Sequence, residues 1–229
     1  MAKNNMNLQE KVSLTNEIFE RALSIAPLKQ TYVAWTGGKD STVTLYLWAH
    51  FLEEKGYKDK PGAINLDTGL KFPEIIEFRD NIARRWDIDL LVISPDFAIA
   101  DYPVAQDKVD CCRDLKIAPL KQTIIEKKVK VLITGIRNDE HPDRSNRDQA
   151  EEKSDPAYWQ VNPILHWTEM DIWSFTIQKN MPYCKLYEQG YTSLGCMPCT
   201  GKATGNEERS GRAGEKEENL KILRGLGYF

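Results

Sequence analysis

The sequence has no apolar run of about 18 residues, the length that a membrane-spanning helix needs. Residues 1–10 are polar and lack the apolar core of a secretory signal peptide. We therefore expect a cytoplasmic protein that is neither secreted nor membrane-spanning. The sequence also lacks an excess of positive charge: its net charge of −3 argues against a broadly basic nucleic-acid-binding protein, although a local basic patch is compatible with it.

The cysteines do not have the pattern of a disulfide framework. There are five, an odd number, in a chain that shows no signal peptide. This combination is typical of a reducing compartment and of metal or redox chemistry.

Two common phosphate-binding motifs are missing as well. The Walker motif ends in Gly-Lys-Ser/Thr, whereas Gly37-Gly38-Lys39 is followed here by Asp40. The pattern GxGxxG is also absent. Any phosphate site near this glycine pair must therefore be of another type.

The residues around the glycine pair nevertheless predict a strand, a glycine turn and a helix N-terminus. Residues 31–35 are apolar, branched and aromatic, as in a buried parallel strand, and apolar residues recur at helical spacing after Asp40. In this arrangement backbone N–H groups and the helix dipole favour an anion. Lys39 adds a cation, and Thr36 and Ser41 add hydroxyl donors. The alternative is an ordinary turn followed by an exposed Lys-Asp pair.

The same stretch resembles the PP-loop, SGGxDS, of ATP pyrophosphatases, with Thr36 in the first serine position. This resemblance implies that ATP and Mg²⁺ bind at the loop and that ATP is cleaved between its α- and β-phosphates. The nucleotide-binding residues that it implies are Thr36, Gly37, Gly38, Lys39, Asp40 and Ser41.

The rest of the chain alternates between predicted strands and helices, which favours right-handed crossovers and a parallel sheet. Further strands are expected over residues 62–66, 90–93 and 129–133, and helices over residues 8–25 and 72–86. The predicted fold is α/β: a Rossmann-like doubly wound parallel sheet of the adenine nucleotide alpha-hydrolase type, with an irregular Cys-containing C-terminal region. The predicted segments are an N-terminal helix (1–30), a PP-loop nucleotide-binding domain (31–165) and a C-terminal helical and loop extension with the CxxC motif (166–229).

Two further strand ends should lie on the same rim of the sheet as the loop. Asp67 follows the second strand, where it could hold a ribose hydroxyl or Mg²⁺, or simply form a turn. Gly135 and Arg137 follow the fourth strand, and the planar fork of an arginine suits phosphate or sulfate. The stretch from Asp67 to Glu74 resembles the DTG-x-x-FPE segment of sulfonucleotide reductases and the ATP sulfurylase small subunit. That resemblance implies nucleotide binding by Asp67. Gly135 and Arg137 belong to a stretch that resembles the GxRxxE…R segment lining the nucleotide site of the same family, and a solvated charged loop is the alternative.

Two cysteine pairs, Cys111-Cys112 and Cys196/Cys199, form the second strong signal. Four thiolates suit zinc or an iron–sulfur cluster. Structural zinc usually takes two spaced pairs, because adjacent cysteines splay apart on a helix. The pattern CC…CxxC resembles the ligands of the [4Fe–4S] cluster of adenylylsulfate reductases, which implies such a cluster here. Zinc and unliganded thiols are the alternatives.

Cys184 stands outside these pairs. A lone cysteine is most often a small buried apolar residue, but it could also carry sulfur as a persulfide or attack as a thiolate. We therefore keep it as a catalytic candidate together with Lys39, Asp40 and Arg137.

The combined motifs resemble the PP-loop sulfonucleotide superfamily and, within it, the phosphoadenosine phosphosulfate and adenylyl sulfate reductases. Reductases of this family carry a nucleophilic cysteine in a C-terminal ECGxH motif, whereas no cysteine follows Cys199 here. The phosphate loop, which is often degraded in reductases, is intact. Both features favour an ATP pyrophosphatase that adenylates an acceptor, expected to be a nucleic acid, for sulfur incorporation. The nearest functional type is the corresponding component of DNA phosphorothioation, and tRNA thiolation is the neighbouring option.

The expected partners of such an enzyme are a cysteine desulfurase or other sulfur donor, a DNA or tRNA acceptor, and a second copy of the chain. Two alternatives belong to other classes. One is a phosphoadenosine or adenylyl sulfate reductase that produces sulfite, and the other is a non-catalytic subunit that binds nucleotide and carries a cluster.

Overall fold

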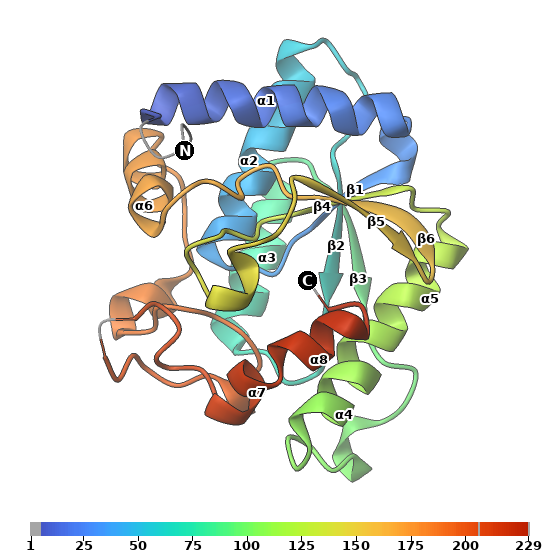
Figure 1. Cartoon of the computed structure of the whole chain (residues 1–229), viewed down its shortest axis with the longest axis vertical. Helices are drawn as coiled ribbons and strands as arrows, with labels where there is room; N and C mark the ends of the chain where they lie inside the picture. The colour runs from blue at the N-terminus through green and yellow to red at the C-terminus, as the bar shows by residue number, and fades with distance from the viewer. Residues whose placement is uncertain (1–5, 206, 229) are drawn as a thin grey trace.

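A six-stranded sheet forms the centre of the protein, with the strand order β3–β2–β1–β4–β6–β5 (Figure 1). The computed structural model describes residues 6–205 and 207–228. All neighbouring strands are parallel except β5, which pairs antiparallel with β6. This confirms the predicted doubly wound α/β sheet. The strands are β1 (Thr31–Ala34), β2 (Gly62–Leu66), β3 (Asp89–Ile93), β4 (Val131–Thr134), β5 (Ala150–Ser154) and β6 (Ala157–Val161).

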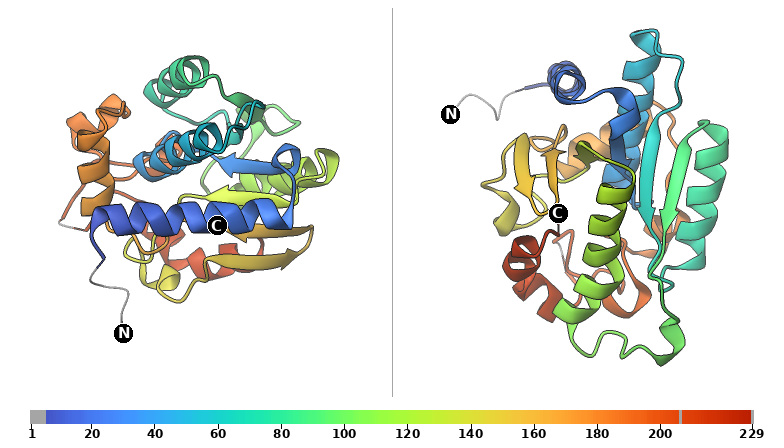
Figure 2. Two further views of the ribbon diagram at one scale, coloured as in Figure 1. Left: turned by 90° about the horizontal axis from the view of Figure 1, so that it is seen from above. Right: turned by 90° about the vertical axis from the view of Figure 1, so that its right-hand side faces the viewer.

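Helices cover both faces of the sheet (Figure 2). On one face the buried side chains of α1, α2 and α6 form a cluster with Val33 and Ile133, and on the other α5 packs on Ala34 and Leu132. Consecutive residues of one strand thus pack against helices on opposite faces, as in a sheet that is buried on both sides. The helices are α1 (Leu8–Ile25), α2 (Lys39–Glu54), α3 (Pro73–Arg85), α4 (Lys108–Cys112), α5 (Ala118–Glu126), α6 (Glu169–Gln178), α7 (Gly214–Glu218) and α8 (Leu220–Gly225).

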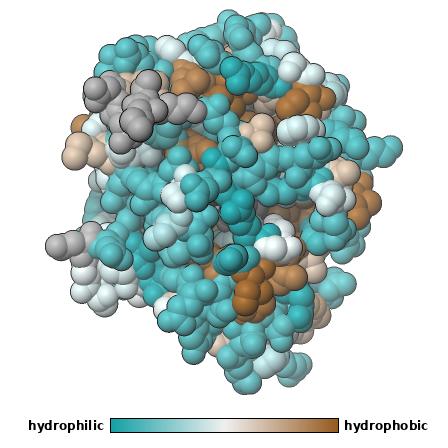
Figure 3. All heavy atoms as spheres, in the orientation of Figure 1, coloured by the Kyte–Doolittle hydropathy of each residue, from teal (hydrophilic) through white to brown (hydrophobic). Residues whose placement is uncertain are grey.

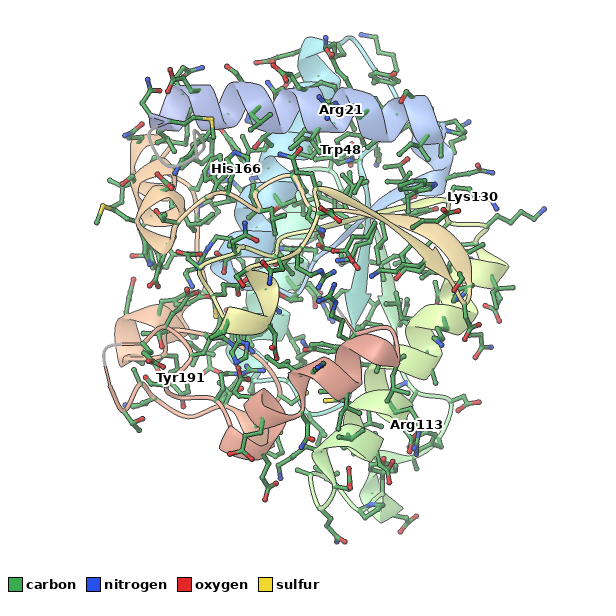
Figure 4. All side chains as sticks on the ribbon, viewed as in Figure 1. Arg21, Trp48, Arg113, Lys130, His166 and Tyr191 are labelled. Carbon is green, nitrogen blue, oxygen red and sulfur yellow. The ribbon has the colours of Figure 1, made fainter. Side chains whose placement is uncertain are left out.

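The N-terminal helix α1 forms as predicted and covers α2. Asn7 and Glu10 form a capping box at its start, which satisfies backbone N–H groups that have no partner within the helix. Phe19 is fully buried against Trp48, at 5.0 Å between ring centroids. Trp48 lies next to α1 in Figure 4. This contact anchors the helix that begins at the phosphate loop.

The β5–β6 hairpin is not among the strands expected from the sequence, where the charged residues Glu151 to Lys153 have the composition of a solvated loop. They form the edge strand β5, where exposed and half-buried residues alternate. Glu151 accepts hydrogen bonds from Arg147 and Lys153. The prediction was wrong here because charged side chains are typical of protected edge strands as well as of loops.

The surface is mainly polar on the face drawn in Figure 3, where hydrophobic side chains gather in separate areas. None of the helices in residues 6–205 and 207–228 combines the length and the apolar composition that crossing a membrane requires.

The carboxyl end of β4 lies directly against the start of α2. A Cβ atom on Gly135 would come within 2.8 Å of the backbone N and Cα atoms of Ser41. Backbone atoms cannot move aside as a flexible side chain can. Gly135 is therefore required for the close approach of β4 to the phosphate loop.

We expect Gly135→Ala to destabilise the protein by about 1–3 kcal/mol, because the added methyl group forces two packed backbone segments apart. Urea unfolding measures the change in the free energy of unfolding. Gly214→Ala is the matched control: nothing lies within 4 Å of a Cβ at this position in α7, so stability should change by less than about 0.5 kcal/mol. Equal stabilities of the two variants would contradict the proposed close contact.

Candidate functional site

The phosphate loop connects β1 to α2 and has the geometry expected from the sequence. Gly37 has φ +84°, and a Cβ there would lie 2.9 Å from the Ile75 side chain, so this position requires glycine. Gly38 is the N-cap of α2, and its N–H donates to Thr36 Oγ1 at 3.2 Å. Ser41 Oγ lies 3.0 Å from Thr36 Oγ1. The two predicted hydroxyl groups thus face the same turn.

Lys39 and Arg137 lie together on the predicted rim, but carboxylates already engage both of them. Lys39 Nζ and Arg137 Nη2 each donate to the carboxylate of Glu208, and Arg137 Nη1 donates to Asp40. The side chains of Lys39 and Arg137 are 1% and 0% exposed. Burial opposes their charged forms, but the nearby acids, Asp40 first among them, outweigh it and hold both pKa values above their ordinary range.

A second part of this network is centred on Glu140. Its carboxylate accepts hydrogen bonds from the backbone N–H of Arg137, at 2.9 Å, and from the Arg144 side chain. Arg209 Nη1 lies 3.8 Å away. Burial alone would raise the pKa of Glu140, but Arg144, Arg137 and Arg209 lower it to about 2. Glu140 is therefore an anion at neutral pH that holds three arginines in place.

Asp67 lies on the rim, but it forms part of a turn. Its carboxylate accepts a hydrogen bond from the N–H of Gly69 at 3.0 Å and from Arg79 Nη1 at 3.0 Å. The next residue, Thr68, has its hydroxyl 3.2 Å from Cys196 Sγ, and Met197 N donates to Leu70 O at 2.8 Å. The Asp67–Gly69 turn thus positions the CxxC motif.

The four paired cysteines come together although the pairs are far apart in the sequence. Cys111 and Cys112 lie in α4, while Cys196 and Cys199 flank a 3₁₀ turn, and all four are buried around one cavity. Helices α7 and α8 pack against α4 on the same side of the molecule (Figure 1). Within residues 6–205 and 207–228, the only group of three acidic, cysteine or histidine ligand atoms within 4.8 Å of one another is Asp40, Glu140 and Glu208. No three of the four sulfurs therefore lie within 4.8 Å of one another.

A cavity between the loop and the cysteines carries basic side chains that have no carboxylate partner among residues 6–205 and 207–228. Lys71, Lys116 and Arg212 line it together with apolar side chains such as Ile64 and Leu120. Two neighbouring cavities share its lining residues: Arg212 also lines the one beside the phosphate loop, and Lys116 also lines the one among the cysteines. The three cavities therefore lie next to one another.

Arg212 has a buried donor atom that the described part of the chain does not satisfy. Its Nη1 donates to Thr200 Oγ1 at 2.9 Å, but its buried Nε has no partner in the described part of the chain. Burial, followed by the neighbouring Arg209, lowers the pKa of Arg212. The nearby acid Glu217 pairs with Arg209. A bound anion would satisfy this guanidinium.

Cys184 lies apart from these cavities, in an apolar cluster with Ile75 and Leu186. It is 1% exposed, and burial raises its pKa. Both features favour the thiol over the reactive thiolate.

Several residues of the site were not identified from the sequence. Glu208 and Tyr187 contact Lys39, and Lys71 and Lys116 line the central cavity. Arg212, which lines the same cavity, was not identified either. The one available signal was that Lys116 and Arg212 lie in stretches that resemble the reductases.

Comparison with known proteins identifies the family. The profile described as "Phosphoadenosine phosphosulfate reductase domain" matches residues 30–202. The chain belongs to this family. Adenosine 5'-phosphosulfate reductase 1 of Bacillus subtilis is 32% identical over 167 residues, which are 68% of this chain and 71% of the relative. Relatives of 30–33% identity from Salinibacter ruber, Geobacillus kaustophilus and Mycobacterium tuberculosis carry the same reductase name, and the alignments cover 56–69% of their lengths.

Solved structures confirm the fold of this reductase-family chain. The phosphoadenylyl-sulfate reductase of Candida auris superposes with a TM-score of 0.69 at 18% identity, over 82% of this chain and 90% of that one. Candida glabrata FMN adenylyltransferase gives 0.68 at 20% identity, over 96% and 83%. The U34-tRNA thiolase of Methanococcus maripaludis, solved with its [4Fe–4S] cluster, gives 0.58 at 14% identity, over 96% and 75%.

The predicted main activity, an ATP pyrophosphatase that adenylates a nucleic acid, is wrong. The relatives at about 30% identity are adenosine 5'-phosphosulfate reductases, which supports the alternative of sulfonucleotide reduction. The prediction rested on the intact loop and on the lack of a cysteine after Cys199, and the reductase relatives show that these two features do not identify an ATP pyrophosphatase. The expected partners, namely a cysteine desulfurase, DNA or tRNA and a second copy, are untested and stay predictions.

The depressed pKa of Glu140 predicts a pH-dependent contribution to stability. Its folded-state pKa of about 2 lies below the ordinary 4.5, so the stabilisation is present above pH 4.5 and is lost as the pH falls toward 2. We expect Glu140→Gln to lower the free energy of unfolding by on the order of 3 kcal/mol at pH 7, and by about half of that at pH 3.

Urea unfolding at both pH values measures this difference. Glu54→Gln at the exposed end of α2 is the control and should show no such difference. A gap between wild type and Glu140→Gln that stays constant from pH 7 to pH 3 would show that Glu140 is not held as a stabilised anion.

Proposed function

We propose that the protein reduces adenosine 5'-phosphosulfate to sulfite and AMP with electrons from a thiol reductant. The carrying observation is the cavity between the phosphate loop and the cysteines, in which Lys71, Lys116 and Arg212 have no carboxylate partner among the described residues. The names of the reductase relatives support the same activity.

The lining of the cavity suits both parts of this substrate. The phosphosulfate group is an anion that can accept hydrogen bonds from the planar fork of Arg212 and from the two ammonium groups. Apolar side chains such as Ile64 and Leu120 offer a surface for the adenine ring. Thr36 and Ser41 add hydroxyl donors at the mouth of the loop.

The reduction consists of two displacements. A thiolate of the reductant attacks the sulfur of the sulfate group, so that an S–S bond forms while the S–O bond to the phosphate breaks and AMP leaves with the electron pair. A second thiol of the reductant then attacks the thiol-derived sulfur, forms a disulfide and releases sulfite. Sulfur(VI) is thereby reduced to sulfur(IV), and two thiols are oxidised. The basic side chains of the cavity stabilise the charge on the departing phosphate.

The reductant supplies the attacking thiolate in this scheme. Cys184 is a buried thiol with a raised pKa, and the remaining four cysteines are assigned to a cluster. An external dithiol of the thioredoxin type provides both sulfurs that the balance requires.

The four paired cysteines fit a [4Fe–4S] cluster better than zinc. Tetrahedral zinc with Zn–S bonds of about 2.3 Å places its sulfurs about 3.8 Å apart. No three of these sulfurs lie within 4.8 Å of one another, and a cavity separates them. A cluster with one thiolate on each iron matches such wider spacing. When bound, it would present a polarisable negative centre to the Lys116 ammonium, which lines both this cavity and the central one.

The activity is tested by anaerobic incubation of the protein with adenosine 5'-phosphosulfate, its 3'-phosphorylated form or ATP, together with thioredoxin and its reductase. We expect sulfite and AMP from the first substrate and no pyrophosphate from ATP. Arg212→Ala and Arg212→Lys should lower kcat/KM by at least about tenfold, since a lost charged hydrogen bond costs about 1.5–3 kcal/mol. The exposed Arg224→Ala in α8 should keep wild-type activity. Absence of sulfite from both sulfonucleotides would refute the proposed activity.

The cluster is tested by the iron and sulfide content of anaerobically purified protein. We expect about four irons and four sulfides per chain, and nearly complete loss of both in Cys111→Ser and Cys199→Ser. Cys184→Ser is the matched control because it removes another buried thiol, and it should retain full iron content. Stoichiometric zinc without iron in the wild-type protein would refute the cluster assignment.

A further inference from the structure

The carboxylate of Glu208 occupies the place at the phosphate loop where an anionic ligand would be expected. It accepts hydrogen bonds from Lys39 Nζ and Arg137 Nη2, the two buried cations nearest the start of α2. Glu208 comes from the C-terminal region, 169 residues after Lys39. The protein therefore supplies its own anion to the cations of the loop.

Further contacts enclose the Lys39 ammonium. Its Nζ also donates to the backbone carbonyl of Thr192 at 3.1 Å and lies 3.5 Å from Asp40 Oδ2. The ring of Tyr187 covers it, at 5.6 Å from the ring centroid. An ammonium group has three donors, and these contacts account for them.

The first N–H of α2 is occupied as well. Lys39 N donates to the hydroxyl of Tyr187 at 2.8 Å, although a free helix N-terminus would offer this group to a phosphate. The segment that carries Glu208 is fixed in turn, because Thr192 Oγ1 donates to the Glu208 carbonyl at 2.6 Å. Two side chains of the C-terminal region thus fill the part of the loop around Lys39.

Negative charge also accumulates at this end of the site. Carboxylate oxygens of Asp40, Glu140 and Glu208 lie within 4.8 Å of one another. Each is balanced by a buried arginine or lysine. A polyphosphate entering here would meet three carboxylates and compete with Glu208 for two cations, which costs binding free energy.

A cavity lies beside the loop and borders this network, since Asp40, Glu140 and Tyr187 are among its lining residues. Thr36, Ser41 and Arg212 line it, while neither Lys39 nor Arg137 is among its described lining residues. It shares Arg212 with the neighbouring cavity of Lys71 and Lys116, and Glu208 is not among the described lining residues of either. A nucleotide with one phosphate can bind there, whereas β- and γ-phosphates that reached Lys39 and Arg137 would have to displace the Glu208 carboxylate.

We propose that Glu208 is a specificity-determining residue that takes the place of the β- and γ-phosphates, so that the intact loop excludes ATP and admits nucleotides with a single phosphate ester. This inference deepens the proposed function, because adenosine 5'-phosphosulfate and AMP are such nucleotides. Tyr187 acts with Glu208 by capping the Lys39 N–H. The substrate class of the site is therefore decided by a residue of the C-terminal region.

The test is the affinity of the cluster-loaded protein for AMP and for ATP, measured by isothermal titration calorimetry with and without Mg²⁺. We expect wild-type protein to bind AMP at least about tenfold more tightly than ATP, since ATP must displace a buried ion pair. Glu208→Gln and Glu208→Ala should narrow this ratio to within about threefold, mainly through tighter binding of ATP. The matched control Glu207→Gln changes the exposed neighbouring acid and should keep the wild-type ratio.

Wild-type protein that binds ATP as tightly as AMP would overturn the inference, as would a ratio that Glu208→Gln leaves unchanged. If the Glu208 variants do not fold, Tyr187→Phe provides the test. This variant frees the Lys39 N–H, so it should strengthen ATP binding relative to AMP binding. These outcomes are distinct from failure of the proposed function. A protein that discriminates as expected but releases no sulfite refutes only the reaction, and one that binds neither nucleotide refutes both.

Discussion

Lys39 and Arg137 are buried cations at the carboxyl ends of the strands, and the arrangement of the whole site depends on the acids that neutralise them. A buried charge without a partner costs several kcal/mol, so the chain must bring carboxylates to this point. Asp40 comes from the loop itself, whereas Glu208 comes from the far end of the chain. Their pairing closes the C-terminal region over the phosphate loop and leaves a different set of cations open to a ligand.

The cations that stay open to a ligand are the basis of the proposed reaction. Lys71, Lys116 and Arg212 come from three separate segments and meet in one cavity with apolar walls. The acids nearest to them are used elsewhere, since Asp67 pairs with Arg79 and Glu217 with Arg209. The loop cations are thus paired with acids, whereas the basic side chains of this cavity have no carboxylate partner among the described residues, which suits the anionic substrate that we propose. The cysteine pairs line a neighbouring cavity, and Lys116 borders both that cavity and the one with Lys71 and Arg212.

The features that were predicted correctly depend on residues that are close to one another in the sequence. The strand, glycine turn and helix from Thr31 to Glu54 could be recognised because hydrophobic spacing and backbone requirements are local. The CC…CxxC spacing identified two cysteine pairs, and the structure brings them around one cavity. The hairpin β5–β6 was missed because its first strand is charged and lies at the edge of the sheet, where the alternation of polar and apolar residues is weak.

The sequence by itself determined the α/β fold, the phosphate loop and the candidate metal ligands, because each of these is recognised from residues that lie close together in the sequence. Only the tertiary structure decided how the loop is used. Glu208 lies 169 residues from Lys39 and Tyr187 lies 148 residues from it, and no periodicity or motif connects residues so far apart. Electrostatic neutralisation is a property of distances in space, so the anion that a lysine binds is known only when the chain has folded.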